Sequence, residues 1–525
     1  MPVPSKTLLN LYLRWLTFRT QQGIKKSRFD PRSQQALWRR LIDRFIPSAR
    51  GKLHELEPNI SYDLFRREMP LADHFDLVPF VERIQDGEPD VLFPGTCKLF
   101  VRTAGTTHDK PWTLPVTEEQ QSHFSAATQA TMLYATARSG HIDSLYGRVM
   151  MLANGTEPDP SHTRCKVTDL PTVAATHLPA WASDHFFEPP ASIVKEVNWT
   201  EYMSKLIEHS MFLDITTIVA QPHWLLDFAE TLFETSGRNN QRTTNLAGVW
   251  PNLACIVHTG SSARPYAREL RRIGGTGVIL HEVFSTAEGI FAAQDSGGVS
   301  SLRLLTDVGI FYEFLPVEDW HPSRKAQLHA KLISLEEVAT ETDYLLVVTT
   351  PAGLVRHMTG DIIRFTGLQP HRIVHMGQLG LQLNRFEENV SERDVTDALV
   401  AACRMHHWSI TQFHVAPLVS TNKLSDVKGC HEWWIELRPG ARETPTGPLI
   451  ARLIDGHLRQ NHRRYAEMRE AGELDPPVVR LVIPGSFRHW QHHTGRLGSV
   501  FKIPRARSDR DLAQSLAGMT RFSHE

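Results

Sequence analysis

A short cluster of hydroxyl-bearing residues and glycine follows an apolar run near residue 100 and has the composition of a phosphate-binding turn. The cluster consists of Thr103, Ala104, Gly105, Thr106 and Thr107. Hydroxyls and exposed backbone N–H groups on a glycine turn after a strand suit the oxygens of a polyphosphate. The Walker pattern is not present, because no Gly-Lys-Ser/Thr follows. On local grounds alone, a plain hairpin loop explains the same residues.

A second candidate is the carboxylate of Glu288, which follows a buried strand predicted over residues 278–280. Mg²⁺ prefers one or two carboxylates together with phosphate oxygens and water, so Glu288 beside a polyphosphate would hold this cation. The ring of Phe284, four residues earlier, suits stacking on a purine. The alternative is that Glu288 caps a helix after a core strand.

A third candidate is Asp361, in a segment that runs from Thr350 to Gly367. The pair Gly360-Asp361 stands between two β-rich runs, which predicts that Asp361 lies at a strand junction with its side chain facing a cleft. One carboxylate can accept hydrogen bonds from both hydroxyls of a ribose. A Gly-Asp turn that joins a hairpin is an equally good local explanation.

The order and spacing of these segments resemble the adenylate-forming superfamily, and most closely the Gretchen Hagen family of auxin-responsive acyl-acid amido synthetases. The family's Ser-Ser-Gly-Thr-Ser/Thr motif is similar to residues 103–107, and its Tyr-x-x-Ser-Glu motif is similar to residues 284–288. Its Tyr-Arg-x-x-x-Gly-Asp motif is similar to residues 355–361. The segments 431–437 and 495–505 also resemble the family's C-terminal domain, so the similarity covers nearly the whole chain.

This resemblance implies an α/β fold with two domains. Residues 1–378 would form a large adenylation domain of mixed sheets and helices, and residues 379–525 a small, mobile α+β lid domain. It also implies a ligase that forms carbon–nitrogen bonds. ATP and a small carboxylic acid would give acyl-AMP and pyrophosphate, and an amine, expected to be an amino acid, would then take the acyl group and release AMP. ATP and Mg²⁺ are the implied cofactors.

The resemblance also assigns roles to single residues. Glu288 would bind Mg²⁺, and Lys502 would reach the active site from the small domain, although the residues alone favour a solvated loop lysine. The nucleotide would be bound by Thr103, Ala104, Gly105, Thr106, Thr107, Phe284, Thr286, Ala287, Arg356 and Asp361. The acyl pocket is expected to be lined by Arg138, Trp224 and Tyr266. The alternatives are a surface position at a helix end for the arginine and core packing for the two aromatic residues.

The chain departs from the family pattern at several positions. Trp112 stands where the family has a lysine, Phe284 replaces a tyrosine, Ala287 replaces a serine, and Gln378 stands where many adenylate-forming enzymes have an arginine. Because of these changes, a second hypothesis is that the protein is a nucleotide-binding module without catalytic activity. A third hypothesis is an acyl-CoA-type ligase with a thiol acceptor, although the sequence has no basic cluster that suits the 3′-phosphate of CoA. The residues do not identify the base that deprotonates the amine.

Composition narrows the classes of partner. The 57 Lys and Arg residues nearly balance the 58 Asp and Glu residues, which argues against nucleic acid or an anionic membrane as the main partner. Five scattered cysteines without disulfide or metal spacing favour a cytoplasmic location. The apolar start, residues 8–18, is interrupted by Asn10 and Arg14, which predicts an amphipathic helix docked on the large domain. The less favoured alternative for this helix is attachment to a membrane. We expect a monomer whose partners are its small-molecule substrates.

Helical and strand-like segments alternate from residue 30 to about residue 376, which is typical of α/β proteins. Thr117 is expected to begin a helix that ends at Arg138. Strands are predicted at residues 148–153, 215–220, 254–258, 278–280, 311–315 and 344–349, and a loop at residues 155–171. After a hinge near residues 377–380, a capping box at Ser391 and Asp394 predicts a helix to about residue 406. The same region should contain strands at 410–419, 432–437 and 478–483 and one long helix over 449–471.

Overall fold

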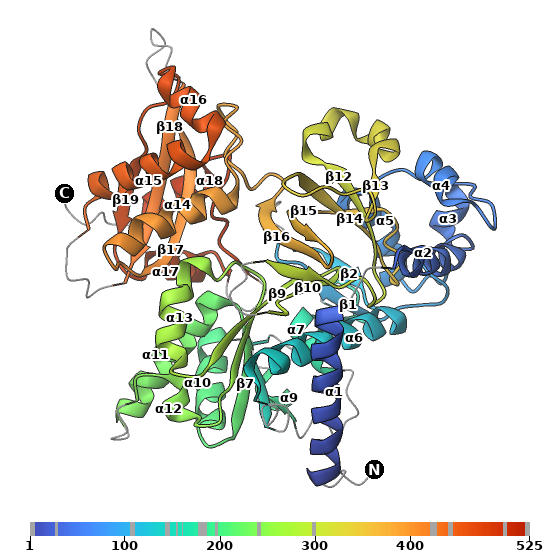
Figure 1. The fold of residues 1–525 in the computed structure, drawn as a ribbon, viewed down its shortest axis with the longest axis horizontal. Coiled ribbons are helices and arrows are strands. Elements are labelled where there is room, and N and C mark those ends of the chain that lie inside the picture. Colours follow the sequence, from blue (N-terminus) through green and yellow to red (C-terminus); the bar gives the residue numbers. More distant parts are fainter. Residues whose placement is uncertain are drawn as a thin grey trace. The chain divides into compact units, whose positions relative to one another are not determined.

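The computed structural model describes residues 6–26, 30–105, 111–141, 147–153, 156–159, 161–176, 186–194, 198–238, 243–296, 301–420, 428–438, 445–496 and 501–519 (Figure 1). The chain divides into two compact units. Unit 1 comprises Met1–Ala104, Pro111–Gly260 and Ile273–His375, and unit 2 comprises Gly105–Lys110, Ser261–Arg272 and Met376–Glu525. The segment Ser261–Arg272 therefore belongs to the same unit as the C-terminal part of the chain, although it lies within the predicted large domain, residues 1–378.

A twelve-stranded mixed sheet forms the centre of the described part of unit 1. Its strands, in spatial order, are β13 (Ile333–Ser334), β12 (Phe311–Pro316), β14 (Asp343–Thr349), β15 (His357–Leu368), β16 (His371–Gln378), β11 (Leu302–Leu304), β10 (Gly289–Ala293), β9 (Ile279–Thr286), β8 (Cys255–His258), β7 (Ile215–Ala220), β3 (Arg148–Met151) and β6 (Phe187–Glu188). The run from β9 to β6 is parallel, whereas β9 and β10 are antiparallel. The predicted α/β architecture and the six predicted strands of this region are confirmed.

A second, four-stranded sheet of unit 1 was not predicted. Its spatial order is β2 (Thr113–Pro115), β1 (Leu99–Arg102), β5 (Lys166–Thr168) and β4 (Thr156–Pro158). The prediction of a loop at residues 155–171 is therefore wrong, because two short strands lie within it. Strand β5 pairs in parallel with β1, with Leu99 opposite Lys166. Strands of three residues carry too little periodic pattern to be recognised in a polar stretch.

The helices of unit 1 surround these sheets. They are α1 (Lys6–Lys26), α2 (Pro31–Phe45), α3 (Ala49–Leu53), α4 (Tyr62–Glu68), α5 (His74–Gln85), α6 (Glu118–Ser139), α7 (Leu170–Thr176), α9 (Ala191–Val194), α10 (Trp199–Ser210), α11 (Pro222–Arg238) and α12 (Leu246–Val249). The helix α13 (Ala267–Gly274) begins in unit 2 and ends in unit 1. Among the described residues, no helix has the length and apolar character needed to cross a membrane.

Helix α6 begins where the sequence predicts. The hydroxyl of Thr117 accepts a hydrogen bond from the N–H of Gln120, and Gly140 ends the helix in a left-handed conformation. Helix α1 packs against α6, and the side-chain amide of Gln21 donates to the carbonyl of Ala137 at 3.1 Å. The predicted docking of the N-terminal helix on the large N-terminal part is therefore confirmed.

Unit 2 contains a three-stranded sheet in the order β17 (Ile410–Val419), β18 (Gly429–Leu437) and β19 (Val478–Val482). Strands β17 and β18 are antiparallel, and β18 and β19 are parallel. Its helices are α14 (Glu392–Met405), α15 (Gly447–Asn461), α16 (Arg463–Glu470), α17 (Ser486–His493) and α18 (Asp511–Met519). Figure 1 shows α14 and α15 beside this sheet.

Two helix predictions for unit 2 have different outcomes. The capping box at Ser391 and Asp394 is present, and it begins α14. The prediction of a single helix over 449–471 is wrong, because the helix is interrupted at His462. This residue has an extended backbone, and its ring accepts from the N–H of Tyr465, so it ends α15 and caps α16. The apolar period continues through the break, which is why the pattern suggested one helix.

Candidate active site

Glu288 lies in the tight turn that joins β9 to β10. Strand β9 is longer than the sequence predicts and continues to Thr286, so Glu288 does not cap a helix. Only 8% of the residue is exposed. The hydroxyl of Thr286 donates to one carboxylate oxygen, and the Nε2 atom of His357 lies 3.4 Å from the other. Two neighbours therefore fix the orientation of this carboxylate.

The environment of Glu288 favours its ionised form. Burial by itself would raise the pKa of the carboxyl group. The hydrogen bonds from His357 and Thr286 outweigh burial and hold the pKa below its ordinary value. The group is therefore an oriented anion, which is what a divalent cation requires. Among the described residues, no three His, Cys, Asp or Glu side chains form a metal-binding cluster. Mg²⁺ commonly combines one carboxylate with phosphate oxygens and water.

Asp361 lies within β15, neither at a strand junction nor in a hairpin turn, so both local predictions for it are wrong. Met358 is opposite Val347 of β14, and Ile362 is opposite Leu345. A step of four residues in β15 therefore matches a step of two in β14, which defines a bulge. Gly360, with a φ of 84°, supplies a backbone conformation that other residues rarely adopt. Bulges of this kind re-aim side chains and are frequent beside active sites.

The side chain of Asp361 is oriented by a histidine of the neighbouring strand. The Nε2 atom of His375, in β16, donates to Asp361 at 2.9 Å. The ring of His375 also lies against the ring of Phe284, with centroids 4.9 Å apart. Phe284 belongs to β9 and packs on Phe291 at 5.5 Å. One histidine therefore links the second and third sequence motifs.

Two hydrogen bonds between Thr103 and Trp112 close the loop that contains the predicted phosphate-binding residues 103–107. The N–H of Thr103 donates to the carbonyl of Trp112 at 2.7 Å, and the N–H of Trp112 donates to the hydroxyl of Thr103 at 2.9 Å. Gly105 has a φ of 63°, which fits a turn that reverses the chain. Ala104 is half-buried. Thr106 and Thr107 lie outside the residues that the structure describes.

Aromatic contacts connect this loop to the carboxylate. The ring of Trp112 lies 4.2 Å from that of His74, the first residue of α5. The ring of His74 lies 6.5 Å from that of His357, which in turn contacts Glu288. Within unit 1, Trp112 therefore links Thr103 of the first motif to residues of the other two motifs, whereas Gly105 is assigned to unit 2. Sequence reasoning did not assign the histidines at 74, 357 and 375, because proximity to a motif is weak information in a chain with 27 histidines.

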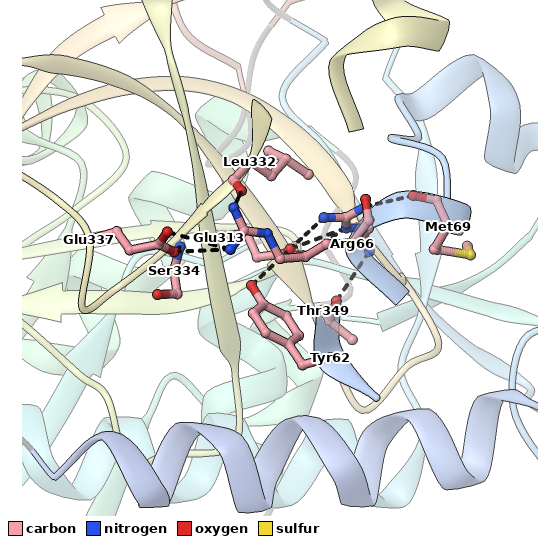
Figure 2. Close-up of polar contacts among 9 residues, drawn as sticks. Tyr62, Arg66, Met69, Glu313, Leu332, Ser334, Glu337 and Thr349 are labelled. Carbon is pink, nitrogen blue, oxygen red and sulfur yellow. Dashed lines mark hydrogen bonds and ion pairs between the residues drawn. The ribbon is translucent and has the colours of Figure 1, made fainter. Parts of the chain in front are cut away.

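Arg356 does not fit the predicted nucleotide-binding role. Its side chain has no exposed surface, and its guanidinium forms a buried ion pair with Glu313 at 2.7 Å. Another guanidinium nitrogen donates to the carbonyls of Met69 and Arg66. Figure 2 shows the surroundings of this pair, where Tyr62 also points at Glu313. The geometry corrects the prediction, because every donor group of the side chain points at protein atoms.

The three residues predicted for the acyl pocket lie in separate environments. Arg138, at the end of α6, is half-buried rather than a surface residue, and one guanidinium nitrogen contacts the carbonyl of Leu280, His281 and Gln294. Burial lowers its pKa. Trp224 is fully buried and packs edge-on against Trp199 at 4.9 Å, which is the core role given as its alternative.

Tyr266 and Lys502 belong to unit 2. The hydroxyl of Tyr266 donates to Gln412 at 3.0 Å, and the guanidinium of Arg505 lies 5.7 Å from its ring centre. Tyr266 therefore connects the segment Ser261–Arg272 to β17 inside unit 2. Lys502 is half-buried in an irregular segment that precedes α18. Ala287, in unit 1, packs against the apolar core there.

Three domain families match the chain in order. The GH3 family N-terminal domain matches residues 25–204, the GH3 family central domain matches residues 303–375, and the GH3 family C-terminal domain matches residues 393–511. Together these matches cover most of the chain.

Curated relatives and solved structures agree with these matches. A jasmonoyl–L-amino acid synthetase of Nicotiana attenuata is 22% identical over 502 residues, which cover 84% of this chain and 85% of that protein. A GH3 domain-containing protein of Mus musculus is 28% identical and covers 51% of each chain. The structure named GH3.15 acyl acid amido synthetase matches with a TM-score of 0.72, 18% identity and coverage of 100% and 99%. A 2-hydroxyisobutyryl-CoA ligase matches with a TM-score of 0.51, 13% identity and coverage of 93% and 91%. The fold is therefore that of adenylate-forming enzymes.

Proposed function

Because the chain belongs to the GH3 family, we propose that it is an ATP-dependent acyl-acid amido synthetase. In the first step, a carboxylate oxygen of a small acid forms a bond to the α-phosphorus of ATP as the bond to pyrophosphate breaks. In the second step, the nitrogen of an amino acid forms a bond to the acyl carbon. The bond from that carbon to AMP then breaks, and the proton of the amine passes to solvent.

One observation carries this proposal beyond membership of the family. Glu288 and Asp361, which come from separate sequence motifs, are each oriented by a buried or half-buried histidine of the same sheet. Two oriented carboxylates, together with the ring of Phe284 that contacts His375, form a set of groups that suits a magnesium nucleotide. The plant relative named above supports the reaction type, since by name it is a jasmonoyl–L-amino acid synthetase.

The predicted nucleotide-binding residues would divide the binding of ATP between them. Asp361 would accept hydrogen bonds from the ribose hydroxyls, while Phe284 would cover the purine. The segment from Thr103 to Thr107 would hold the phosphates. Glu288 would bind Mg²⁺, which neutralises charge on the phosphates as pyrophosphate leaves. Positioning and charge neutralisation supply most of the rate in such a transfer.

Lys502 would act from unit 2. An ammonium group can stabilise the charge that develops between the α-phosphate and the incoming carboxylate oxygen. Lys502→Ala should therefore reduce adenylation more than it reduces the binding of ATP. If adenylation by Lys502→Ala equals that of the wild type, the residue is the solvated loop lysine that its local sequence suggests.

The first test is ATP–pyrophosphate exchange that depends on added carboxylic acids, with pools of aromatic, short-chain and fatty acids and with Mg²⁺. This assay reports the first step without the correct amine. Glu288→Gln should abolish exchange, and Asp361→Asn should weaken it at low ATP concentration, whereas the control Glu282→Gln, on the same strand β9, should leave exchange unchanged.

The second test identifies the acceptor. The acid that supports exchange is incubated with ATP and each amino acid, and the amide product is detected by mass spectrometry. Formation of a thioester with CoA, and of no amide, would replace the proposal with an acyl-CoA ligase. Bound ATP without exchange in any acid pool would replace it with a non-catalytic nucleotide-binding module.

A further inference from the structure

Helix α1 carries a stripe of exposed apolar side chains. Leu11, Trp15 and Phe18 are 69%, 51% and 60% exposed, and Tyr12 beside them is 55% exposed. A spacing of four and then three residues places Leu11, Trp15 and Phe18 on one face of a helix. The rings of Tyr12 and Trp15 are stacked, with centroids 6.2 Å apart. Large apolar side chains gathered in this way usually mark a binding surface.

The stripe is not the face that docks on the rest of unit 1. Thr17 is buried and Leu16 is half-buried on another side of α1, and Gln21 bonds to α6. Figure 1 shows the N-terminal end of α1 projecting beyond α6. The helix therefore has one side that docks on the rest of unit 1 and a second, apolar side that faces solvent.

The charge of α1 has one sign only. Its residues Lys6–Lys26 include five basic residues and no acidic residue, although the whole chain is nearly neutral. Arg14 and Arg19 are exposed, and three- and four-residue spacing places them on the two sides of the apolar stripe. The guanidinium of Arg19 lies 5.4 Å from the ring centre of Trp15. Aromatic residues flanked by arginines are typical of helices that lie in the interface of a membrane.

We propose that α1 binds the surface of a membrane that contains anionic phospholipids. The aromatic stripe would enter the boundary between headgroups and acyl chains, and the flanking arginines would contact lipid phosphates. A second copy of the chain fits this surface poorly, because two helices that each carry five cations and no anion repel one another. The proposed membrane binding is separate from the proposed ligase reaction and does not depend on it. It also revises the expectation from overall charge that no membrane is a partner, since the relevant charge is local.

The proposal is tested by flotation of the full-length protein with lipid vesicles. One set of vesicles consists of phosphatidylcholine alone, and the other of phosphatidylcholine mixed with phosphatidylglycerol. We expect binding to the mixed vesicles at low salt, weaker binding as salt screens the arginines, and much weaker binding to phosphatidylcholine.

Two double variants separate the apolar and the electrostatic contributions. Trp15→Ala with Phe18→Ala, and Arg14→Glu with Arg19→Glu, should each reduce partitioning by at least about tenfold. The matched controls are Phe212→Ala, at an exposed phenylalanine with 88% exposure outside α1, and Arg404→Glu, at an exposed arginine of α14. Both controls should bind like the wild type. Thermal unfolding midpoints close to that of the wild type would show that the variants remain folded.

Three results would overturn the proposal. The first is equal binding, or no binding, to the two kinds of vesicle at low salt. The second is wild-type binding by both double variants. The third is a wild-type dimer that Trp15→Ala with Phe18→Ala converts to a monomer in light scattering, because a second copy of the chain would then cover the stripe.

Discussion

The Nε2 atom of His357 lies 3.4 Å from a carboxylate oxygen of Glu288, although the two residues are 69 positions apart in the chain. Glu288 ends one motif of the predicted nucleotide site and His357 lies inside another. Both side chains are almost completely buried. The contact therefore fixes the relative position of the two motifs and keeps the carboxylate ionised.

Removal of this contact should change the pH dependence of the reaction. His357→Leu takes away a hydrogen bond that lowers the pKa of Glu288, so the pKa of the carboxyl group rises. The acid limb of kcat/KM for exchange should move to higher pH, and activity near neutral pH should fall on the order of tenfold. His357→Asn keeps a donor and should restore part of the activity. An unchanged acid limb in His357→Leu, with lower activity, would mean that the histidine only fills space.

Asp361 should discriminate between ATP and its deoxy analogues. If it accepts hydrogen bonds from the ribose hydroxyls, Asp361→Asn should raise the KM for ATP by roughly tenfold to a hundredfold, the range expected for a hydrogen bond to a charged group. The wild type should bind 2′-deoxy-ATP or 3′-deoxy-ATP more weakly than ATP, and the variant should lose this preference. Equal loss of kcat for all three nucleotides would instead indicate that the variant disturbs the β15 bulge.

The sequence predicted the strands and the motif residues better than it predicted their surroundings. Strand β7 was predicted with its exact bounds, because a run of buried apolar residues has a clear pattern. The bulge around Gly360 was missed, since a Gly-Asp pair between two strands has the same local signature as a turn. His375 could not be assigned, because only the register between β15 and β16 brings it to Asp361. Register is a property of the assembled sheet and is not encoded in either strand alone.

The ion pair between Arg356 and Glu313 should be important for stability and not for nucleotide binding. Both side chains are buried, and Tyr62 adds a hydrogen bond to the same carboxylate. Arg356→Met leaves Glu313 as an unpaired buried charge and should lower the free energy of unfolding by about 3–5 kcal/mol. The double variant Arg356→Met, Glu313→Leu should cost less, because neither charge remains. Denaturant unfolding measures both effects. A normal stability together with a large rise in the KM for ATP would restore the nucleotide-binding role.

His123 should make the protein less stable in mild acid. Its ring is buried, its Nδ1 atom lies 2.8 Å from the carbonyl of Val308, and its Nε2 atom accepts from the N–H of Ile290 at 3.1 Å. This arrangement requires a neutral ring, and burial lowers the pKa from 6.5 to about 4. The unfolded chain therefore binds a proton as the pH falls below 6.5, whereas the folded chain does not until about 4.

The free energy of unfolding should consequently decrease as the pH is lowered from 6.5 to about 4. Above pH 6.5, His123 should contribute little to any pH dependence of this free energy. Between about pH 7 and about pH 5 the contribution of His123 corresponds to roughly 2 kcal/mol. His123→Gln supplies one donor and one acceptor without titrating, so its unfolding free energy should depend less on pH over that range. Other buried histidines titrate in both proteins, and the difference between the two urea-unfolding profiles isolates the effect of His123. Parallel profiles would show that the ring is already able to take up a proton in the folded protein.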